Sequence, residues 1–292
     1  MASDTASARV ATPNLANITD RCFFTLMCEI PYSSAMSLLC FPCCVIHACV
    51  YINILIYFTP VGETRMTHRI YHGSVMEIPR PLLSKGKENN DYGRGFYCTE
   101  DMELAREWAC KEKLPPGFVN MYELDMEGLA VLDLSASGYS VLNWMAVLLA
   151  NRTFDLDTDI GLEVREYLIA NFMPPIGEAD VVIGYRADDS YFSYADSFVN
   201  NALSLRRLNE ALRLGRLGLQ TALRSERAFD KLSYIGSETV AWDECHARHV
   251  ARDNAARETW RNELRSAASA ADDIYAVDVI RRGLRHGDQS LQ

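Results

Sequence analysis

The stretch YGRGFYCT, from Tyr92 to Thr99, decides how the middle of the chain must fold. Its two glycines permit a turn, and Phe96 to Thr99 has the β propensity of a short strand. Thr99 can then cap a helix with an acidic first turn. The apolar residues of that helix recur at helical spacing: Met102, Ala105, Trp108 and Ala109. The sequence therefore predicts a loop, a strand and a helix in direct succession.

Short strands and helices continue on both sides of this stretch. Upstream, Arg69 to Tyr71 predicts a strand that ends at His72-Gly73-Ser74. Downstream, we expect strands over 119–124, 129–134, 179–185 and 217–223, and helices over 141–150, 162–172 and 197–214. The elements do not follow a regular strand-helix-strand series, so the predicted fold class is α+β.

Length, charge and cysteine usage limit the class of protein. The chain has 292 residues, 49% of them apolar, and a net charge of -10. This suffices for one sizeable core with appendages, and the negative charge argues against nucleic acid as the main partner. Six of the nine cysteines precede residue 50, a distribution unlike a disulfide framework. We expect a cytoplasmic main domain, without a metal site.

The N-terminal part is apolar enough to raise two interpretations. Residues 35–58 are almost entirely apolar, and at 1.5 Å per residue they are long enough to cross a bilayer core of about 30 Å. Arg65 and Arg69 follow the run and would keep the C-terminal part in the cytoplasm. The alternative is a misassigned start codon, with Met66 as the first residue. The sequence leaves both open, so membrane anchoring is expected only if residues 1–65 are made.

These features divide the chain into three predicted parts. Residues 1–65 form the hydrophobic N-terminal segment, residues 66–235 the main domain, and residues 236–292 a helical C-terminal tail of mixed charge.

Three motifs in the main domain carry a resemblance to a known superfamily. They are YHGS at Tyr71–Ser74, DYGRGFYCT at Asp91–Thr99 and DVVIGYRADD at Asp180–Asp189. The first two, in this order, resemble the His-Tyr-Glu branch of the ADP-ribosyltransferase superfamily, which includes the poly(ADP-ribose) polymerases. All three are still more similar to a bacterial family of that superfamily that is catalogued as a domain of unknown function. The resemblance implies split β-sheets with a cleft for NAD.

The resemblance also implies roles for individual residues. His72 would bond the adenosine ribose and Gly73 would offer its backbone to the nicotinamide amide, with Ser74 beside them. Glycine suits that place because a side chain would keep the ring from the main chain. Tyr97 would stack on nicotinamide and Trp108 would close the other face.

At one position the chain departs from the branch. Gln220 stands where the branch has a glutamate, and we take His72, Tyr97 and Gln220 as the candidate catalytic residues. A carboxylate there would stabilise oxocarbenium character and accept a proton, whereas a neutral amide can only orient the ribose. Asp188 and Asp189 are candidate acid or base groups, and a solvated turn is the alternative for both.

The resemblance leads to one main hypothesis and two alternatives. The first is transfer of ADP-ribose from NAD to an unknown acceptor, such as a protein, with NAD hydrolysis as a variant and a neutralising protein as a further partner. The second is a module that binds NAD or ADP-ribose without turnover and acts through a protein partner. The third is a membrane-anchored interaction domain with a vestigial pocket.

Overall fold

The computed structural model describes residues 67–110, 116–156, 158–187, 189–214, 218–266 and 272–291. The predicted N-terminal segment 1–65, with the apolar run 35–58, lies outside these residues. Among the helices that are described, none combines the length and the apolar character needed to cross a membrane.

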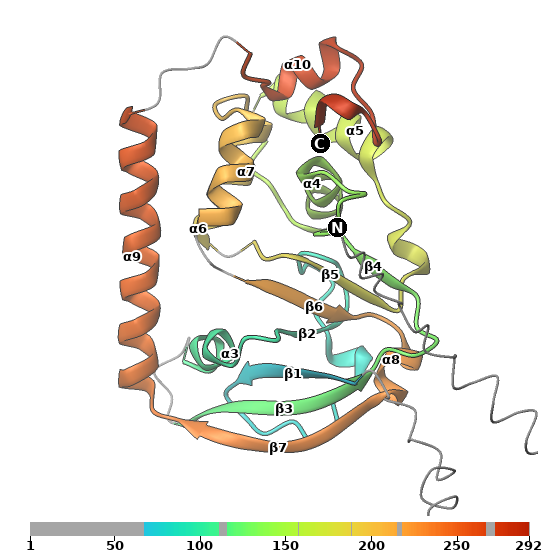
Figure 1. Ribbon diagram of the computed structural model, residues 1–292, viewed down its shortest axis with the longest axis vertical. Helices are drawn as coiled ribbons and strands as arrows, with labels where there is room; N and C mark the ends of the chain where they lie inside the picture. Colours follow the sequence, from blue (N-terminus) through green and yellow to red (C-terminus); the bar gives the residue numbers. More distant parts are fainter. Residues whose placement is uncertain are drawn as a thin grey trace, which may run out of the picture. The chain divides into compact units, whose positions relative to one another are not determined.

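Two β-sheets form the centre of the domain (Figure 1). The first is antiparallel, in the order β1 (Thr67–Ser74), β3 (Gly117–Asp125), β7 (Leu232–Val240). The second has the order β2 (Phe96–Cys98), β6 (Leu219–Leu223), β5 (Val181–Tyr185), β4 (Val131–Asp133), and only β4 and β5 are parallel. Tyr71 and Thr99 join the sheets through two backbone hydrogen bonds of 2.7 and 2.9 Å. The α+β prediction is therefore confirmed.

Helices lie in several connections between the strands and follow the last strand, β7. The α-helices are α3 (Met102–Ala109), α4 (Val141–Asn151), α5 (Asp159–Phe172), α6 (Asp189–Val199), α7 (Leu205–Leu214), α8 (Glu226–Asp230), α9 (Trp242–Ser266) and α10 (Ala276–Arg281). Three short 3-10 helices are η1 (Leu83–Lys85), η2 (Ile176–Glu178) and η3 (Gln289–Leu291). Helices α4, α5 and α7 lie on one side of the four-stranded sheet and the three-stranded sheet lies on the other (Figure 1).

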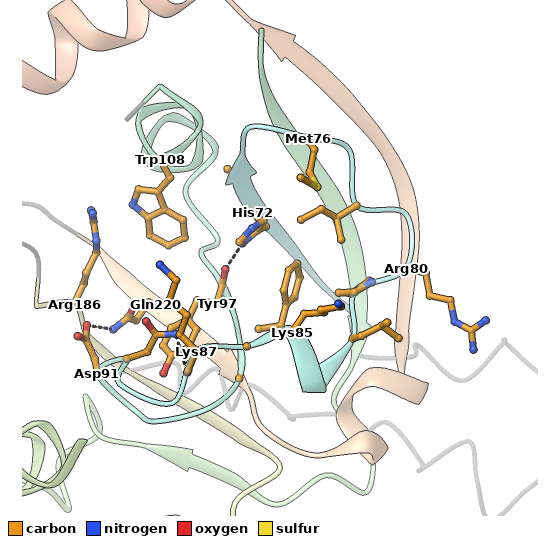
Figure 2. Close-up of a pocket in the computed structure, with 18 of the residues that line it drawn as sticks. His72, Met76, Arg80, Lys85, Lys87, Asp91, Tyr97, Trp108, Arg186 and Gln220 are labelled. Carbon is orange, nitrogen blue, oxygen red and sulfur yellow. Dashed lines mark hydrogen bonds between the residues drawn. The ribbon is translucent and has the colours of Figure 1, made fainter. Parts of the chain in front are cut away.

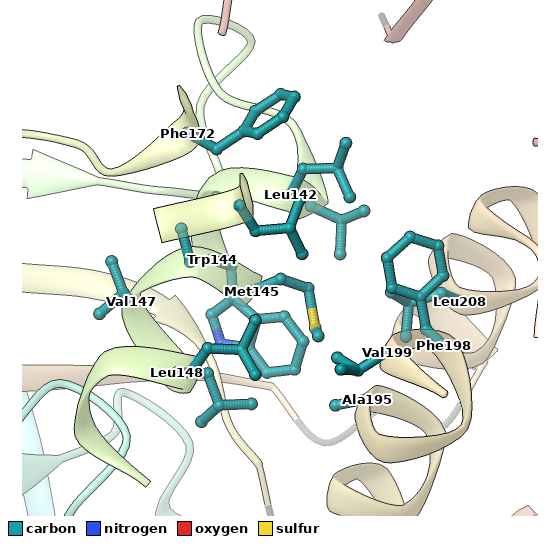
Figure 3. Packing of buried hydrophobic residues seen from close by; sticks show 14 of the residues in the cluster. Leu142, Trp144, Met145, Val147, Leu148, Phe172, Ala195, Phe198, Val199 and Leu208 are labelled. Atoms are coloured by element: carbon teal, nitrogen blue, oxygen red, sulfur yellow. The ribbon is translucent and has the colours of Figure 1, made fainter. Parts of the chain in front are cut away.

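The four-stranded sheet is buried on both faces, which explains its apolar strands. On its helical side, α4 packs Leu142, Trp144 and Met145 against Phe172 of α5 and Phe198 of α6 (Figure 3). On its other side, a second cluster brings its strands against β1 and β3: Ile70, Phe96, Cys98, Tyr122, Leu124, Val181, Leu223 and Ala228. Neighbouring residues of one strand thus enter different clusters, as the period of two in a strand requires.

Two predicted boundaries are wrong. The helix expected over 197–214 is two helices, α6 and α7, because the chain turns at Asn201, which has a positive φ of 60°. The boundary expected at residue 235 falls inside β7, which pairs with β3 up to Val240. The tail therefore begins as a strand, and its helix α10 contributes Ala276 and Val279 to the main core.

Helix α3 packs directly on the backbone of β1. A Cβ atom on Gly73 would lie 1.9 Å from the Ala105 oxygen and 2.6 Å from the Ala109 nitrogen, both in the backbone of α3. No flexible side chain can yield there, so Gly73 is required for this close approach.

We expect Gly73→Ala to lower the free energy of unfolding by about 3 kcal/mol, because α3 must move away from β1. Urea denaturation measures the change. Gly138→Ala is the matched control, because nothing lies within 4 Å of its added Cβ. Equal stability of the two variants would show that α3 does not need this contact.

Asp180 connects the end of the η2 segment to the starts of β4 and α8. Its carboxylate accepts hydrogen bonds from the Ala130 nitrogen at 2.9 Å and from the Ser225 hydroxyl at 2.5 Å, and it pairs with Arg227 at 3.1 Å. The hydrogen bond from Ser225 is the main reason why the pKa of Asp180 lies below its ordinary value. The ionised form therefore stabilises the fold.

We expect Asp180→Asn to lower the free energy of unfolding at pH 7 by about 2 kcal/mol, since it removes hydrogen bonds to a charged group. Because the folded pKa is depressed, this stabilisation is complete above the unfolded pKa of about 3.9 and is lost as the pH falls through the folded pKa. Thermal denaturation at pH 7 and below pH 4 should show a difference from wild type that narrows in acid. Asp230→Asn, at an exposed position of α8, should have the same thermal stability as wild type at both pH values.

Candidate functional site

One cavity of about 1130 Å³ lies where the two sheets and α3 meet. The predicted residues His72, Gly73, Tyr97, Trp108 and Gln220 all line it, and they come from β1, β2, α3 and β6. Its remaining wall is formed by the loop from Met76 to Gly95 and by Arg152, Arg186 and Ala187. Figure 2 shows Trp108, Tyr97 and Gln220 grouped near His72. Residues that are far apart in the sequence therefore share one site.

The hydrogen bond of His72 determines its protonation state. Its Nδ1 lies 2.6 Å from the carbonyl oxygen of Tyr97, which can only accept, so Nδ1 carries the proton. Burial lowers the pKa of His72, more than this hydrogen bond raises it. The imidazole is therefore neutral at physiological pH, and Nε2 is the ring nitrogen that can accept a hydrogen bond.

Tyr97 holds the preceding loop together. Its hydroxyl donates to the Gly93 oxygen at 2.6 Å and accepts from the Tyr92 nitrogen at 3.0 Å. Burial raises the pKa of the Tyr97 phenol, so it remains protonated. The hydroxyl thus shapes the loop from Tyr92 to Tyr97, while the residue also lines the cavity.

Trp108 lies on the cavity side of α3, whereas Leu104, Ala105 and Ala109 form the buried face of that helix. The guanidinium of Arg186 lies 5.0 Å from the centre of its ring, a cation-π contact. The indole Nε1 is buried and has no hydrogen-bond partner among the described residues. Trp108 therefore presents a polar donor as well as an aromatic surface.

Gln220 is buried, with 4% of its surface exposed, and its amide is held by two acceptors. Its Nε2 donates to Oδ2 of Asp91 at 2.8 Å and to the Tyr185 carbonyl at 3.2 Å. Asp91 also accepts from Arg152 at 2.9 Å and from the Ala187 nitrogen at 2.9 Å. Asp91, unlike Gln220, was not predicted from the sequence, although it opens the motif DYGRGFYCT.

The second and third motifs are packed against each other. The Tyr92 hydroxyl donates to the Tyr185 carbonyl at 2.5 Å, and the Trp144 indole donates to the same oxygen at 3.0 Å. A Cβ on Gly184 would lie 2.4 Å from the Tyr92 hydroxyl oxygen, so only glycine fits beside this ring. The glycine of IGY and the backbone carbonyl of its tyrosine therefore hold the tyrosine of DYG in place.

The charge of the cavity is opposite to that of the chain. Five cationic side chains line it, against the two carboxylates of Glu77 and Asp91: Arg80, Lys85, Lys87, Arg152 and Arg186. Neither Lys85 nor Lys87 forms an ion pair with any residue that the structure describes. Arg80 extends away from the other labelled residues (Figure 2). The positive charge favours an anionic ligand. Only Arg186 lies in one of the three motifs, and none of the five was predicted to line the site.

Three further residues were predicted from the sequence to belong to the site: Ser74, Asp188 and Asp189. The Ser74 hydroxyl donates to the Met76 oxygen at 2.5 Å and accepts from the Asn120 amide at 3.1 Å, and Ser74 does not line the cavity. Asp188 lies outside the described residues. Asp189 is the first residue of α6, and its side chain also lies outside them. Within the described ranges, no cluster of His, Cys, Asp or Glu could hold a metal ion.

Comparison with known proteins identifies a family. No curated protein and no solved structure matches the chain. The family DUF3990, described as a protein of unknown function, matches residues 68–234, which is more than half of the chain. The match includes all three motifs and every residue of the cavity wall. The chain therefore belongs to the DUF3990 family.

Proposed function

We propose that the chain transfers ADP-ribose from NAD to an acceptor nucleophile, and that the two sheets form an ADP-ribosyltransferase-like split fold. One observation carries the proposal: a single cavity gathers His72, Tyr97, Trp108 and Gln220 from four separate elements. Its volume of about 1130 Å³ lies at the upper end of small-molecule pockets, which suits an extended dinucleotide.

The groups in the cavity fit the parts of NAD. The neutral His72 offers Nε2 as an acceptor for a ribose hydroxyl, and Tyr97 and Trp108 offer aromatic surface for the nicotinamide ring. Lys85 and Lys87 provide charge for the pyrophosphate. These three kinds of contact would orient the bond that breaks.

The reaction separates nicotinamide from ribose. The bond between the pyridinium nitrogen and C1′ breaks, its electron pair stays on nicotinamide, and the acceptor forms the new bond to C1′ and loses a proton. With water as the acceptor the result is NAD hydrolysis. Positive charge develops on the ribose, so acceptors and dipoles directed at it lower the barrier.

The amide at position 220 favours a second candidate function, a module that binds NAD without turnover. Gln220 carries no negative charge, so it cannot accept a proton from the acceptor. The same experiments decide between the two functions.

The first experiment incubates the full chain with NAD labelled in its adenylate part, with and without cell lysate, and scores free nicotinamide and transferred label. We expect His72→Ala to lower kcat/KM at least about tenfold, the equivalent of one lost hydrogen bond. His68→Ala is the matched control, because His68 lies on the same strand, is only partly buried and does not line the cavity.

Each outcome of this experiment has a defined meaning. Nicotinamide release that His72→Ala reduces and His68→Ala preserves supports transfer or hydrolysis. NAD binding without release, measured by calorimetry, supports the binding module. Absence of NAD binding contradicts both functions.

We expect the double variant Lys85→Ala/Lys87→Ala to raise KM for NAD about tenfold and to leave kcat nearly unchanged. The two exposed charges would each contribute about 0.5–1 kcal/mol to binding of the pyrophosphate, and less at high salt. Steady-state kinetics at low and high salt measure this. Arg69→Ala/Arg257→Ala removes the same charge away from the cavity and should leave KM as in wild type. An equal rise of KM in both double variants would exclude a specific phosphate contact.

A further inference from the structure

Asp91 is a buried carboxylate at the bottom of the site, with 5% of its surface exposed. Among the described residues, its carboxylate only accepts hydrogen bonds. The donors are the Arg152 guanidinium, the Ala187 nitrogen and the Gln220 amide. Both oxygens of the side chain thus act as acceptors, an arrangement that fits the ionised form.

This arrangement fixes the orientation of the Gln220 amide. The carbonyl of Tyr185 can only accept a hydrogen bond, so the end of the Gln220 amide that faces it at 3.2 Å must be Nε2. Nε2 also faces Asp91, and its two hydrogens are therefore both used. Oε1 points away from these two acceptors and accepts no hydrogen bond from the described residues.

The hydrogen bond to Asp91 also affects Oε1 electronically. A bond from an amide to a carboxylate is charge-assisted and about twice as strong as a neutral one. In a buried site it polarises the amide and increases the electron density on its oxygen. Gln220 would therefore present a stronger acceptor to a ribose hydroxyl than an isolated glutamine.

We infer that Asp91 is the positioning residue of this site: it supplies, through Gln220, the negative charge that the amide at position 220 lacks. The inference rests on the proposed function, because it concerns the ribose of NAD. The single carboxylate expected at position 220 is thus divided between two residues. Asp91 carries the charge and Gln220 makes the contact.

The energetics of Asp91 fit a functional rather than a stabilising role. Burial raises the pKa of Asp91, and the bonds from Ala187 and Gln220 and the charges of Arg152 and Arg186 oppose the shift without cancelling it. Since the folded pKa is raised, ionisation of Asp91 costs free energy of folding, and this stability is lost as the pH rises through that pKa. Proteins tolerate such an unfavourable charge mainly at functional sites.

The test compares Asp91→Asn with Asp180→Asn in the full chain, by kcat and KM for nicotinamide release and by Tm. Both variants neutralise a buried, hydrogen-bonded aspartate, and Asp180 does not line the cavity. We expect Asp91→Asn to lower kcat about 100-fold, as for loss of one preorganised electrostatic contact, with KM for NAD and Tm close to wild type. Asp180→Asn should lower Tm and leave kcat unchanged.

A second pair of variants tests the link through Gln220. Gln220→Glu alone places two carboxylates in contact, which must share a proton, so we expect no gain in kcat. In Asp91→Asn/Gln220→Glu the pair again has one carboxylate and one amide, with their places exchanged. We expect this double variant to be at least about tenfold more active than Asp91→Asn.

The outcomes separate this inference from the proposed function. A wild-type chain that releases no nicotinamide contradicts the proposed function, and the inference with it. An active wild type with an equally active Asp91→Asn contradicts the inference alone. A loss of kcat in Asp91→Asn that the double variant does not recover also contradicts the inference. The same holds if Asp91→Asn lowers Tm as much as Asp180→Asn does.

Discussion

The contact between the motif at Asp91-Tyr92 and the end of β5 is the interaction on which the site depends. The Tyr185 carbonyl receives hydrogen bonds from Tyr92, Trp144 and Gln220, and Asp91 binds the Ala187 nitrogen two residues later. Three donors on one carbonyl leave little freedom to the loop, the helix and the strand that supply them. The part of the cavity wall that contains Asp91 and Gln220 is therefore rigid.

The cavity wall depends on a second constraint, the close approach of α3 to β1. This close approach explains why residue 73 is a glycine, since a Cβ atom there would point into α3. The glycine was expected to make room for a nicotinamide ring, and the structure gives it a different reason. A consequence is that Trp108 of α3 is held opposite His72 and Tyr97, where all three line the same cavity.

The contact between Gln220 and Asp91 offers a physical account of why residue 220 is a glutamine and not a glutamate. A glutamate at position 220 would face Asp91 at hydrogen-bond distance, and two ionised carboxylates there would repel each other. Glutamine is compatible with Asp91 because its amide donates. The identity of residue 220 is thus coupled to that of residue 91, and a substitution at either position changes the hydrogen bond that joins them.

The sequence by itself determined the α+β class, most strands, and the residues of the site that lie within contiguous motifs, His72 and Tyr97 among them. Strand propensity, turns and motifs are local properties, so one stretch of chain contains them. Only the tertiary structure decided that Asp91 meets Gln220, 129 residues away, and that Arg152 and Lys87 face the same cavity. It also decided that β7 crosses the boundary expected at residue 235, because the strand stays paired with β3 up to Val240. Such contacts depend on which distant strands become neighbours, and no local pattern encodes that choice.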